Sequence, residues 1–321
     1  MNSYLKVVAL IGATATGKSN IALEVYRHLQ QAMRKILLFS IDSLSVYKTI
    51  DIASAKPSKE VLQEVPHYGI DILEPDELCH AGVMMEALKD VLHIAKEESA
   101  GLLIVGGSSF YLKSFLEGLS NPPPKLNEAQ KLELRDIICR GGGYAFLQDI
   151  DAQYAATLKQ GDTFRVQKAL GIYLATSQTP SEYFLSHQRQ SPILRDIPIF
   201  EIVKERTEIE QHIKERTAKM LESGLIDEVS ALAQKYNNIQ PMKSIGIKET
   251  LEYLSCRISL EDLNQQIVIH TRQLAKRQCT FNRTQFKGYQ VFRGNTQEIT
   301  QKIIQYFKDA KKMGGFFDGI K

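Results

Sequence analysis

Near its N-terminus the chain reads Ile11-Gly12-Ala13-Thr14-Ala15-Thr16-Gly17-Lys18-Ser19, which contains the spacing Gly-x-x-x-x-Gly-Lys-Ser of a phosphate-binding P-loop. An apolar run at residues 7–11 precedes it and predicts a buried strand, and residues 21–29 follow at helical spacing. Glycine lets the backbone approach a phosphate, free amides at the helix N-terminus bind it, and Lys18 adds a positive charge. The sequence therefore predicts that residues 12–19 bind a diphosphate-like group.

The composition is that of a globular protein without a membrane span. Of 321 residues, 43% are hydrophobic and 24% are charged. No apolar run approaches the roughly 20 residues of a transmembrane helix, and the short N-terminal apolar stretch leads into the P-loop, so we expect it to be structural. The four cysteines are far apart and lack zinc-ligand spacing, so we expect a reducing, cytoplasmic setting; they are Cys79, Cys139, Cys256 and Cys279.

Alternating strand and helix patterns predict an α/β fold built on a parallel sheet. Strands are predicted at residues 7–11, 36–41 and 102–105, with helical segments between them. The sequence pattern changes at the proline run of residues 122–124. Beyond it, helical patterns predominate until a strand predicted at residues 199–203. In this second region one helix is expected to end at the glycines of residues 141–143 and another to start at Asp162. We therefore expect a P-loop core flanked by helices, at residues 1–120 and 199–321, with an all-helical insert at 121–198.

The C-terminal region is basic. From His270 to the C-terminus there are eleven lysines and arginines against three acidic residues, whereas the whole chain has a net charge of only +3. A capping box at Ser259 predicts a long helix reaching about Lys287, and four basic residues share one face of it: Arg272, Lys276, Arg283 and Lys287. Aromatic residues lie close by at positions 281, 286 and 289. This face either meets a nucleic-acid backbone or is an ordinary solvated surface.

The P-loop alone leaves several functions open. Nucleotide-hydrolysing P-loop proteins usually place a magnesium-binding Asp after an apolar strand, but residues 102–105 are followed by Gly106-Gly107-Ser108. The only acidic residue that ends a core strand is Asp42, which could hold Mg²⁺ through water, act as a general base or cap a turn. GTPases are therefore disfavoured, while a small-molecule or nucleotide kinase that uses ATP, and a non-catalytic RNA-binding module, remain alternatives.

Motifs along nearly the whole chain resemble those of the tRNA dimethylallyltransferases. After the P-loop come Asp42-Ser43, Val46-Tyr47-Lys48 and the stretch from Asp51 to Pro57, then Val105-Gly106-Gly107-Ser108 with Tyr111. Later parts of the pattern are Asp162-x-x-Arg165, Ser223-Gly224-Leu225, Ser244-Ile245-Gly246 and the octapeptide Thr271-Arg272-Gln273-Leu274-Ala275-Lys276-Arg277-Gln278.

The resemblance implies transfer of a dimethylallyl group from dimethylallyl diphosphate to the exocyclic N6 amine of the adenosine 3′-adjacent to the anticodon of tRNA, with release of diphosphate. By the family pattern Asp42 is the general base, and Lys18, Arg216 and the loop amides hold the leaving diphosphate together with Mg²⁺ bound at Ser19. Ser108 stands where the family usually has Thr, whose hydroxyl faces the bridging oxygen of the leaving group. A monomer is expected.

Other residues are placed against the tRNA by the same resemblance, with the helical insert holding the anticodon stem-loop. They are Asp42, Ser43, Leu44 and Ser45; Phe164, Arg165, Val166, Gln167 and Lys168; Lys243, Ser244, Ile245, Gly246, Ile247 and Lys248; and, on the basic helix, Arg272 and Lys276. The chain departs from the pattern at several positions, where Thr49 replaces Gly, Ala53-Ser54 replaces Gly-Thr, and Lys168, Gly171, Ile247 and Phe281 replace Arg, Glu, Tyr and Trp. Residues 78–81 also match it poorly. These departures affect tRNA contacts and the shape of the donor pocket more than the groups assigned to the chemistry.

Overall fold

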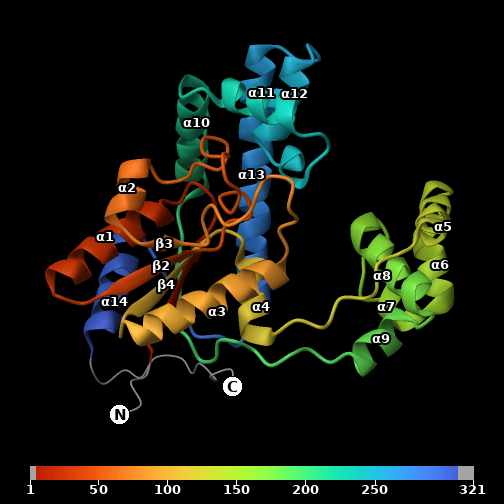
Figure 1. Ribbon diagram of the computed structural model, residues 1–321, viewed down its shortest axis with the longest axis horizontal. Helices are drawn as coiled ribbons and strands as arrows, with labels where there is room; N and C mark the ends of the chain where they lie inside the picture. Colours follow the sequence, from red (N-terminus) through yellow and green to blue (C-terminus); the bar gives the residue numbers. More distant parts are fainter. Residues whose placement is uncertain (1–4, 310–321) are drawn as a thin grey trace. The chain divides into compact units, whose positions relative to one another are not determined.

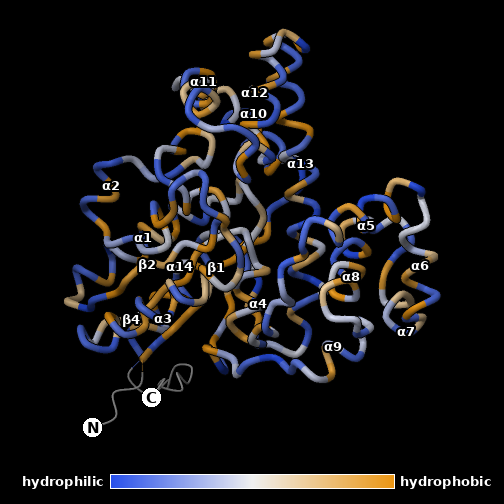
Figure 2. Tube along the Cα trace, turned by 45° about the vertical axis from the view of Figure 1, so that its right-hand side comes forward, coloured by the Kyte–Doolittle hydropathy of each residue, from blue (hydrophilic) through white to orange (hydrophobic). Residues whose placement is uncertain are grey.

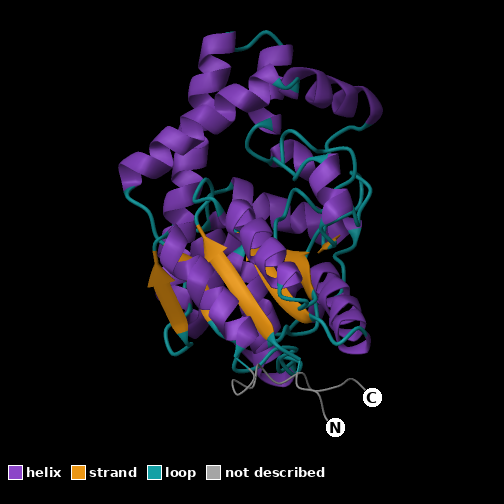
Figure 3. Cartoon of the chain, turned by 90° about the vertical axis from the view of Figure 1, so that its left-hand side faces the viewer, coloured by secondary structure: helices purple, strands orange, loops and turns teal. Residues whose placement is uncertain are grey.

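The computed structural model of the chain describes residues 5–309, which form two compact units. The first unit comprises the described residues up to Leu116 and from Pro192 onward, and the second comprises Glu117–Ser191. The first contains a six-stranded sheet in the order β3-β2-β4-β1-β5-β6, in which every neighbouring pair is parallel (Figure 3). The strands are β1 (Val7–Gly12), β2 (Ile36–Ser40), β3 (His67–Tyr68), β4 (Gly101–Gly106), β5 (Ile199–Ile202) and β6 (Val291–Gly294).

The sheet is buried on both faces, as continuous apolar strands require. On one face α1 (Lys18–Gln31) and α14 (Thr296–Lys308) pack against alternate strand residues such as Leu10, Leu38 and Leu103. On the other face α3 (Ala81–Glu97) and α4 (Ser109–Glu117) lie against the sheet, where Phe39 meets Phe115 edge to face. The strands accordingly appear as orange, hydrophobic segments in Figure 2. This core fixes where each strand ends, and therefore where the loops that follow the strands lie.

Four further helices of the first unit extend beyond the carboxyl ends of the strands, and the longest of them, α13 (Leu260–Gln285), also runs back to the level of α4 (Figure 1). The other three are α10 (Arg206–Glu222), α11 (Leu225–Lys235) and α12 (Ile247–Leu254); a 3-10 turn, η1 (Gln240–Lys243), joins α11 to α12, and the short α2 (Lys59–Glu64) precedes β3. Helices α10 and α13 pack along each other. A capping box between Ser259 and Asp262 starts α13, as the sequence predicts. The helix ends at Gln285, so Lys287 lies in the turn beyond it and does not share the predicted helical face.

The second unit is all helical, as the sequence predicts for this region. Its helices are α5 (Glu128–Cys139), α6 (Gly143–Ile150), α7 (Ala152–Ala155), α8 (Thr163–Thr176) and α9 (Pro180–Ser186). Asp162 caps α8 by accepting a hydrogen bond from the Arg165 amide. The core of this unit is built around Leu134, Leu147 and Leu170. Residues 192–198 belong with the first unit, since the amides of Ile193 and Leu194 bond to the Phe115 carbonyl, so the structural boundary lies earlier than the expected 198.

The predicted strands at residues 7–11, 36–41, 102–105 and 199–203 are confirmed to within one residue at each end. The two outer strands, β3 and β6, were not predicted, because β3 has only two residues and β6 is half exposed. The aromatic side chains near the end of α13 pack on one another, with Phe286 buried between Phe281 and Tyr289. Phe286 is therefore part of the core rather than a stacking surface. Between residues 5 and 309, no helix has the length and apolar character needed to cross a membrane.

Candidate active site

The P-loop forms a tight turn between β1 and α1. Ala15 (φ 63°) and Gly17 (φ 88°) adopt left-handed backbone conformations, and the buried Thr16 hydroxyl donates to the Ala13 carbonyl at 2.8 Å. Left-handed residues in such a turn direct successive amides toward one point, which makes a concave anion site. The Nζ atom of Lys18 donates to the carbonyls of Gly12 (2.9 Å) and Ala13 (2.6 Å). The ammonium group of Lys18 therefore lies against the P-loop, where it adds a positive charge to the anion site.

Two cations and one carboxylate dominate the electrostatics here. Burial lowers the pKa of Lys18 to about 8; nearby Asp42 opposes that shift and nearby Arg216 adds to it. Burial also lowers the pKa of Arg216, again opposed by Asp42, and its guanidinium donates to the Thr14 hydroxyl at 3.2 Å. A buried cation is costly unless an anion compensates it, and Asp42 supplies one negative charge to two cations. The cluster therefore has a net positive charge suited to an anionic ligand.

Asp42 follows β2 and is held in a local turn. One carboxylate oxygen, Oδ1, accepts hydrogen bonds from the amides of Leu44 (2.8 Å) and Ser45 (3.1 Å). The turn-capping role that the sequence left open is therefore present in the structure. It occupies one oxygen of the carboxylate and fixes its orientation. A positioned and half-buried carboxylate with a second oxygen is also what a general base requires.

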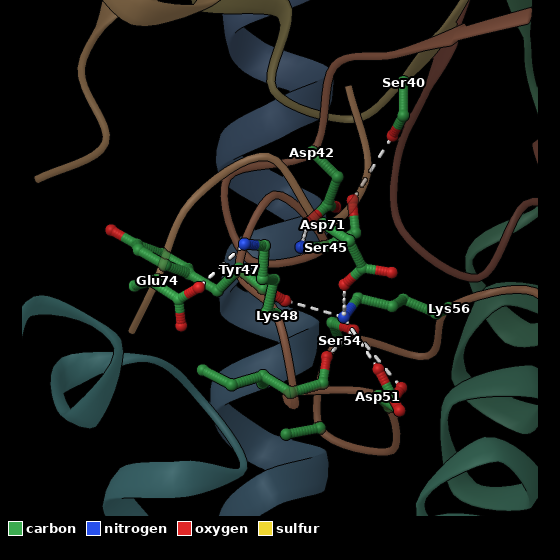
Figure 4. A network of polar contacts seen from close by, with 12 residues as sticks. Ser40, Asp42, Ser45, Tyr47, Lys48, Asp51, Ser54, Lys56, Asp71 and Glu74 are labelled. Carbon is green, nitrogen blue, oxygen red and sulfur yellow. Dashed lines mark hydrogen bonds and ion pairs between the residues drawn. The ribbon is translucent and has the colours of Figure 1, made fainter. Parts of the chain in front are cut away.

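The loop that carries Asp42 is anchored by a buried lysine (Figure 4). The Lys56 side chain is 2% exposed, and its Nζ donates to the Tyr47 carbonyl (2.6 Å) and to carboxylate oxygens of Asp51 (2.7 Å) and Asp71 (2.5 Å). One ammonium group thereby satisfies three acceptors: Tyr47 and Asp51 in the loop after β2, and Asp71 in the loop after β3. Because two carboxylates pair with it, the charge of Lys56 is compensated, in contrast to that of Lys18.

A carboxylate from α11 also holds this loop. Glu228 accepts hydrogen bonds from the amides of Asp51, Ile52 and Ala53, at 2.8, 2.8 and 2.9 Å. Ser54, at a departure from the family pattern, donates its hydroxyl to the Ile50 carbonyl at 2.5 Å. These bonds use backbone amides and a hydroxyl, so the replacement of Gly-Thr by Ala-Ser leaves them possible. The loop is thus fixed independently of any ligand.

Thr49, another departure, has a conformation that glycine would adopt more easily. Its φ of 63° lies in the left-handed region, where a β-branched side chain is strained. The usual glycine of the family would avoid that strain, which is of the order of 1–3 kcal/mol. The neighbouring Lys48 amide bonds to the Leu73 carbonyl at 2.9 Å, so the surrounding loop maintains the turn despite the strain.

Ser108 lies in the turn between β4 and α4. Its amide donates to the Ile41 carbonyl at 3.2 Å, directly beside Asp42. Because β2, β4 and β1 are neighbours in the sheet, the loops that carry Asp42, Ser108 and Lys18 all leave from the same edge. The structure therefore brings Asp42, Ser108, Lys18 and Arg216 into one region, as the predicted roles require.

The residues present fit a magnesium ion held mainly by a substrate. Within residues 5–309 there is no group of three or more His, Cys, Asp or Glu side chains that could hold a metal. Ser19 is exposed in the first turn of α1, beside the P-loop. Mg²⁺ commonly keeps several waters and binds phosphate oxygens with few protein ligands. A hydroxyl next to a diphosphate cradle suits that mode of binding.

The residues expected to contact tRNA from the insert differ in accessibility. Phe164 is 68% exposed, and the Lys168 ammonium lies 5.7 Å from the centre of its ring. Arg165 and Gln167 are also exposed. Val166 is buried in the core of the insert, so its side chain supports α8 and only its backbone could face a ligand.

The predicted segment from Lys243 to Lys248 divides in the same way. Lys243 and Lys248 are exposed, Ser244 and Ile245 are half buried, and Gly246 and Ile247 are buried. Behind them the Glu249 carboxylate accepts the Gly246 amide at 2.7 Å and meets His270 Nδ1 at 2.6 Å. This buried group fixes a turn in which Gly246 has a φ of 92°.

On α13 the two predicted basic residues also differ. Lys276 is exposed, whereas Arg272 is half buried and pairs with Glu210 of α10 at 3.1 Å. A nucleic-acid phosphate that approached Arg272 would have to compete with this carboxylate. Ser43 is exposed and Leu44 half buried, but Ser45 is buried and lies 3.3 Å from the Ser40 hydroxyl.

Sequence reasoning missed several groups that hold the site together. Gln278 bonds to the P-loop and to the turn before Ser108, and His212 Nδ1 lies 3.1 Å from the Ala15 carbonyl. Lys56 lies in the quoted stretch from Asp51 to Pro57, and Glu228 follows the quoted Ser223-Gly224-Leu225 by three residues, but neither received a role. Gln278 ends the quoted octapeptide, so the sequence held a signal for its role. His212 lies in no quoted motif, and the sequence held no signal for it.

Comparisons with known proteins identify the family of this chain. A family model described as IPP transferase matches residues 45–285. A tRNA dimethylallyltransferase of Sulfurimonas denitrificans is 44% identical over 285 residues, which cover 87% of this chain and 92% of that protein. One from Helicobacter pylori is 41% identical over 305 residues, covering 94% of each chain.

Solved structures extend the comparison to the whole fold. The full-length tRNA isopentenylpyrophosphate transferase of Bacillus halodurans is 25% identical, covers 94% of this chain and 95% of its own, and has a TM-score of 0.64. The match therefore includes both units: the one with the P-loop and the helical one. With a family model spanning most of its length and relatives above 40% identity, the chain belongs to the IPP transferase family.

Proposed function

We propose that this chain transfers a dimethylallyl group from dimethylallyl diphosphate to the N6 amine of the adenosine 3′-adjacent to the anticodon of a tRNA, with release of diphosphate. The observation that carries the proposal is a pair of half-buried cations, Lys18 and Arg216, beside a P-loop and a positioned carboxylate, in a chain of the IPP transferase family. A diphosphate leaving group needs positive charge, and an amine nucleophile needs a proton acceptor.

Bond formation and bond breaking involve different groups of the site. The adenosine amine attacks C1 of the dimethylallyl group, the C1–oxygen bond breaks, and the electron pair leaves with the diphosphate. Negative charge grows on that diphosphate, and Lys18, Arg216 and the loop amides stabilise it as it forms. The Ser108 hydroxyl donates a hydrogen bond toward the diphosphate oxygen whose bond to C1 breaks. Ser19 would help to hold a Mg²⁺ ion beside the diphosphate, and that ion would supply further positive charge.

The proton lost by the amine goes to Asp42. An exocyclic amine of adenine is a weak nucleophile, so its proton must depart as the new bond forms. The Oδ1 atom of Asp42 is used by the turn amides of Leu44 and Ser45, which leaves Oδ2 to accept that proton. Such a base contributes roughly 10²–10⁴-fold to the rate.

The tRNA partner is proposed to be bound through its anticodon stem-loop. The target base must leave the stack to reach the strand ends, which is easiest in a single-stranded loop. Exposed side chains on the insert, Phe164 and Lys168, offer an aromatic face and a charge, and Lys276 offers a charge to phosphates. The enzyme is further proposed to act as a cytoplasmic monomer.

A kinase function is not favoured. ATP-dependent phosphoryl transfer by P-loop enzymes usually uses an acidic residue after a core strand to hold Mg²⁺. Here β4 ends at Gly106 and is followed by Gly107 and Ser108. Release of an intact diphosphate does not require an acidic residue after β4.

The proposed function predicts which donor labels the tRNA. The protein is incubated with unmodified tRNA, Mg²⁺ and dimethylallyl diphosphate labelled in its prenyl group, and in parallel with ATP labelled in its γ-phosphate. We expect label in the tRNA from the prenyl donor alone, at the adenosine beside the anticodon. Phosphoryl transfer from ATP without prenylation would contradict the proposal.

Replacing Asp42 by Asn tests the base. An Asn side-chain oxygen can still accept the amides of Leu44 and Ser45, so the turn is retained, but the group no longer accepts a proton at neutral pH. We expect kcat to fall by about 10²–10⁴-fold, while the affinity for tRNA changes little. Asp90→Asn, on an exposed face of α3, is the matched control and should leave kcat unchanged. An unaltered kcat in Asp42→Asn would remove Asp42 from this role.

The lowered pKa of Lys18 predicts a pH dependence of donor capture. In the free enzyme the ammonium group loses its proton as the pH rises through about 8, and only the charged form attracts a diphosphate. Because kcat/KM for the donor reports groups of the free enzyme, it should fall above about pH 8. Arginine stays charged in this range, so Lys18→Arg should show a lower kcat/KM without the fall near that pH. A wild-type profile that is flat from pH 7 to pH 9 would show that another group carries the charge.

A further inference from the structure

Gln278 bonds to two separate parts of the site through one carboxamide. Gln278 lies in the C-terminal third of α13; its Oε1 atom accepts the Thr14 amide of the P-loop at 2.7 Å, and its Nε2 atom donates to the Gly107 carbonyl at 3.0 Å. Both bonds span more than 170 residues of sequence. The acceptor and donor ends of this side chain are therefore both used, each by a different loop.

The two partners of Gln278 lie next to groups with roles in the reaction. Thr14, whose amide it bonds, also accepts the Arg216 guanidinium on its hydroxyl. Gly107 precedes Ser108, whose amide bonds to the Ile41 carbonyl beside Asp42. A series of bonds thus runs from the diphosphate cradle through Gln278 to the turn of Ser108, and from there to Ile41, the residue before Asp42.

The contact with Gly107 is close enough to restrict what can stand there. A Cβ atom built on Gly107 would come within 2.6 Å of Gln278 Nε2, so a larger residue at position 107 would push the end of this carboxamide out of its present position. Gln278 itself is half buried, and a loss of its bonds would leave the Thr14 amide and the Gly107 carbonyl without these partners. The pairing of β1 with β4 brings the two loops close together, and Gln278 joins them beyond the end of that pairing.

We propose that Gln278 is a positioning residue that sets the distance between the leaving-group cradle and the Ser108–Asp42 side of the active site. It acts through Thr14 and Gly107 and takes no part in proton transfer. The inference rests on the proposed function, because Gln278 is taken to position the loop that holds the diphosphate released in that reaction. Its consequence for the reaction is a cradle already formed before the donor binds, which spares the cost of ordering the loop.

Gln278→Met tests this assignment, because Met has a similar volume but replaces both hydrogen-bonding groups. The matched control is Gln273→Met, at an exposed position of the same helix. Two quantities are measured for each variant: the Kd of inorganic diphosphate with Mg²⁺ by calorimetry, and kcat and donor KM for prenyl transfer. Melting temperatures are recorded to detect loss of folding.

For Gln278→Met we expect the Kd of diphosphate to rise about tenfold and kcat to fall about 10–100-fold, with Gln273→Met unchanged. A purely structural role would lower the melting temperature but leave the diphosphate Kd of the folded protein unaltered, and that result would overturn the proposal. If Gln278→Met fails to fold, Gln278→Glu retains the acceptor for Thr14 and lacks the donor to Gly107, and the same loss of kcat is expected. A wild-type protein that binds diphosphate but does not prenylate tRNA would contradict the proposed function and leave the diphosphate test of Gln278 valid.

Discussion

The uncompensated positive charge at the carboxyl edge of the sheet is the constraint on which the rest of this active site depends. Lys18 and Arg216 are both half buried, and burial lowers the pKa of each. The Lys56 side chain is buried, yet two carboxylates pair with it, so it serves as an anchor rather than a ligand site. Lys18 can therefore bind an anionic ligand, whereas Lys56 stabilises the loop.

The parallel sheet is what gathers the reacting groups. Neighbouring parallel strands end at the same edge, so β1, β4 and β2 deliver the P-loop, Ser108 and Asp42 side by side. Helices α10 and α13 then approach this edge from outside the sheet and add Arg216 and Gln278. A phosphate-binding scaffold used elsewhere for nucleotides can in this way serve a carbon–nitrogen bond-forming reaction, provided that the acid after β4 is absent and a base stands after β2.

Local signals in the sequence were sufficient for much of the fold. The P-loop, the cap at Asp162 and the capping box at Ser259 each depend on residues a few positions apart, and the structure has all three elements where the spacing places them. The edge strands β3 and β6 were missed because a strand of two residues, or one that is half exposed, has no clear periodicity.

Part of the site could not be read from the sequence, because it depends on pairs brought together only by the fold. The bond between Thr14 and Gln278 joins residues 264 positions apart, and the contact between Ala15 and His212 joins residues 197 apart. Burial gave a second source of error, since Val166, Ser45 and Ile247 stand inside motifs that the resemblance assigns to tRNA, yet their side chains face the interior. A motif identifies a segment, whereas packing decides which of its side chains can reach a ligand.

The central claim is that the P-loop holds a departing diphosphate, and a crystal structure with dimethylallyl diphosphate and Mg²⁺, compared with one grown with ATP and Mg²⁺, tests it most directly. The account predicts a diphosphate within residues 12–19, with the Lys18 ammonium moved from the carbonyls of Gly12 and Ala13 onto phosphate oxygens and the Arg216 guanidinium beside it. Finding ATP in that cradle, with the prenyl donor excluded and Lys18 still bonded to its own loop, would contradict the account.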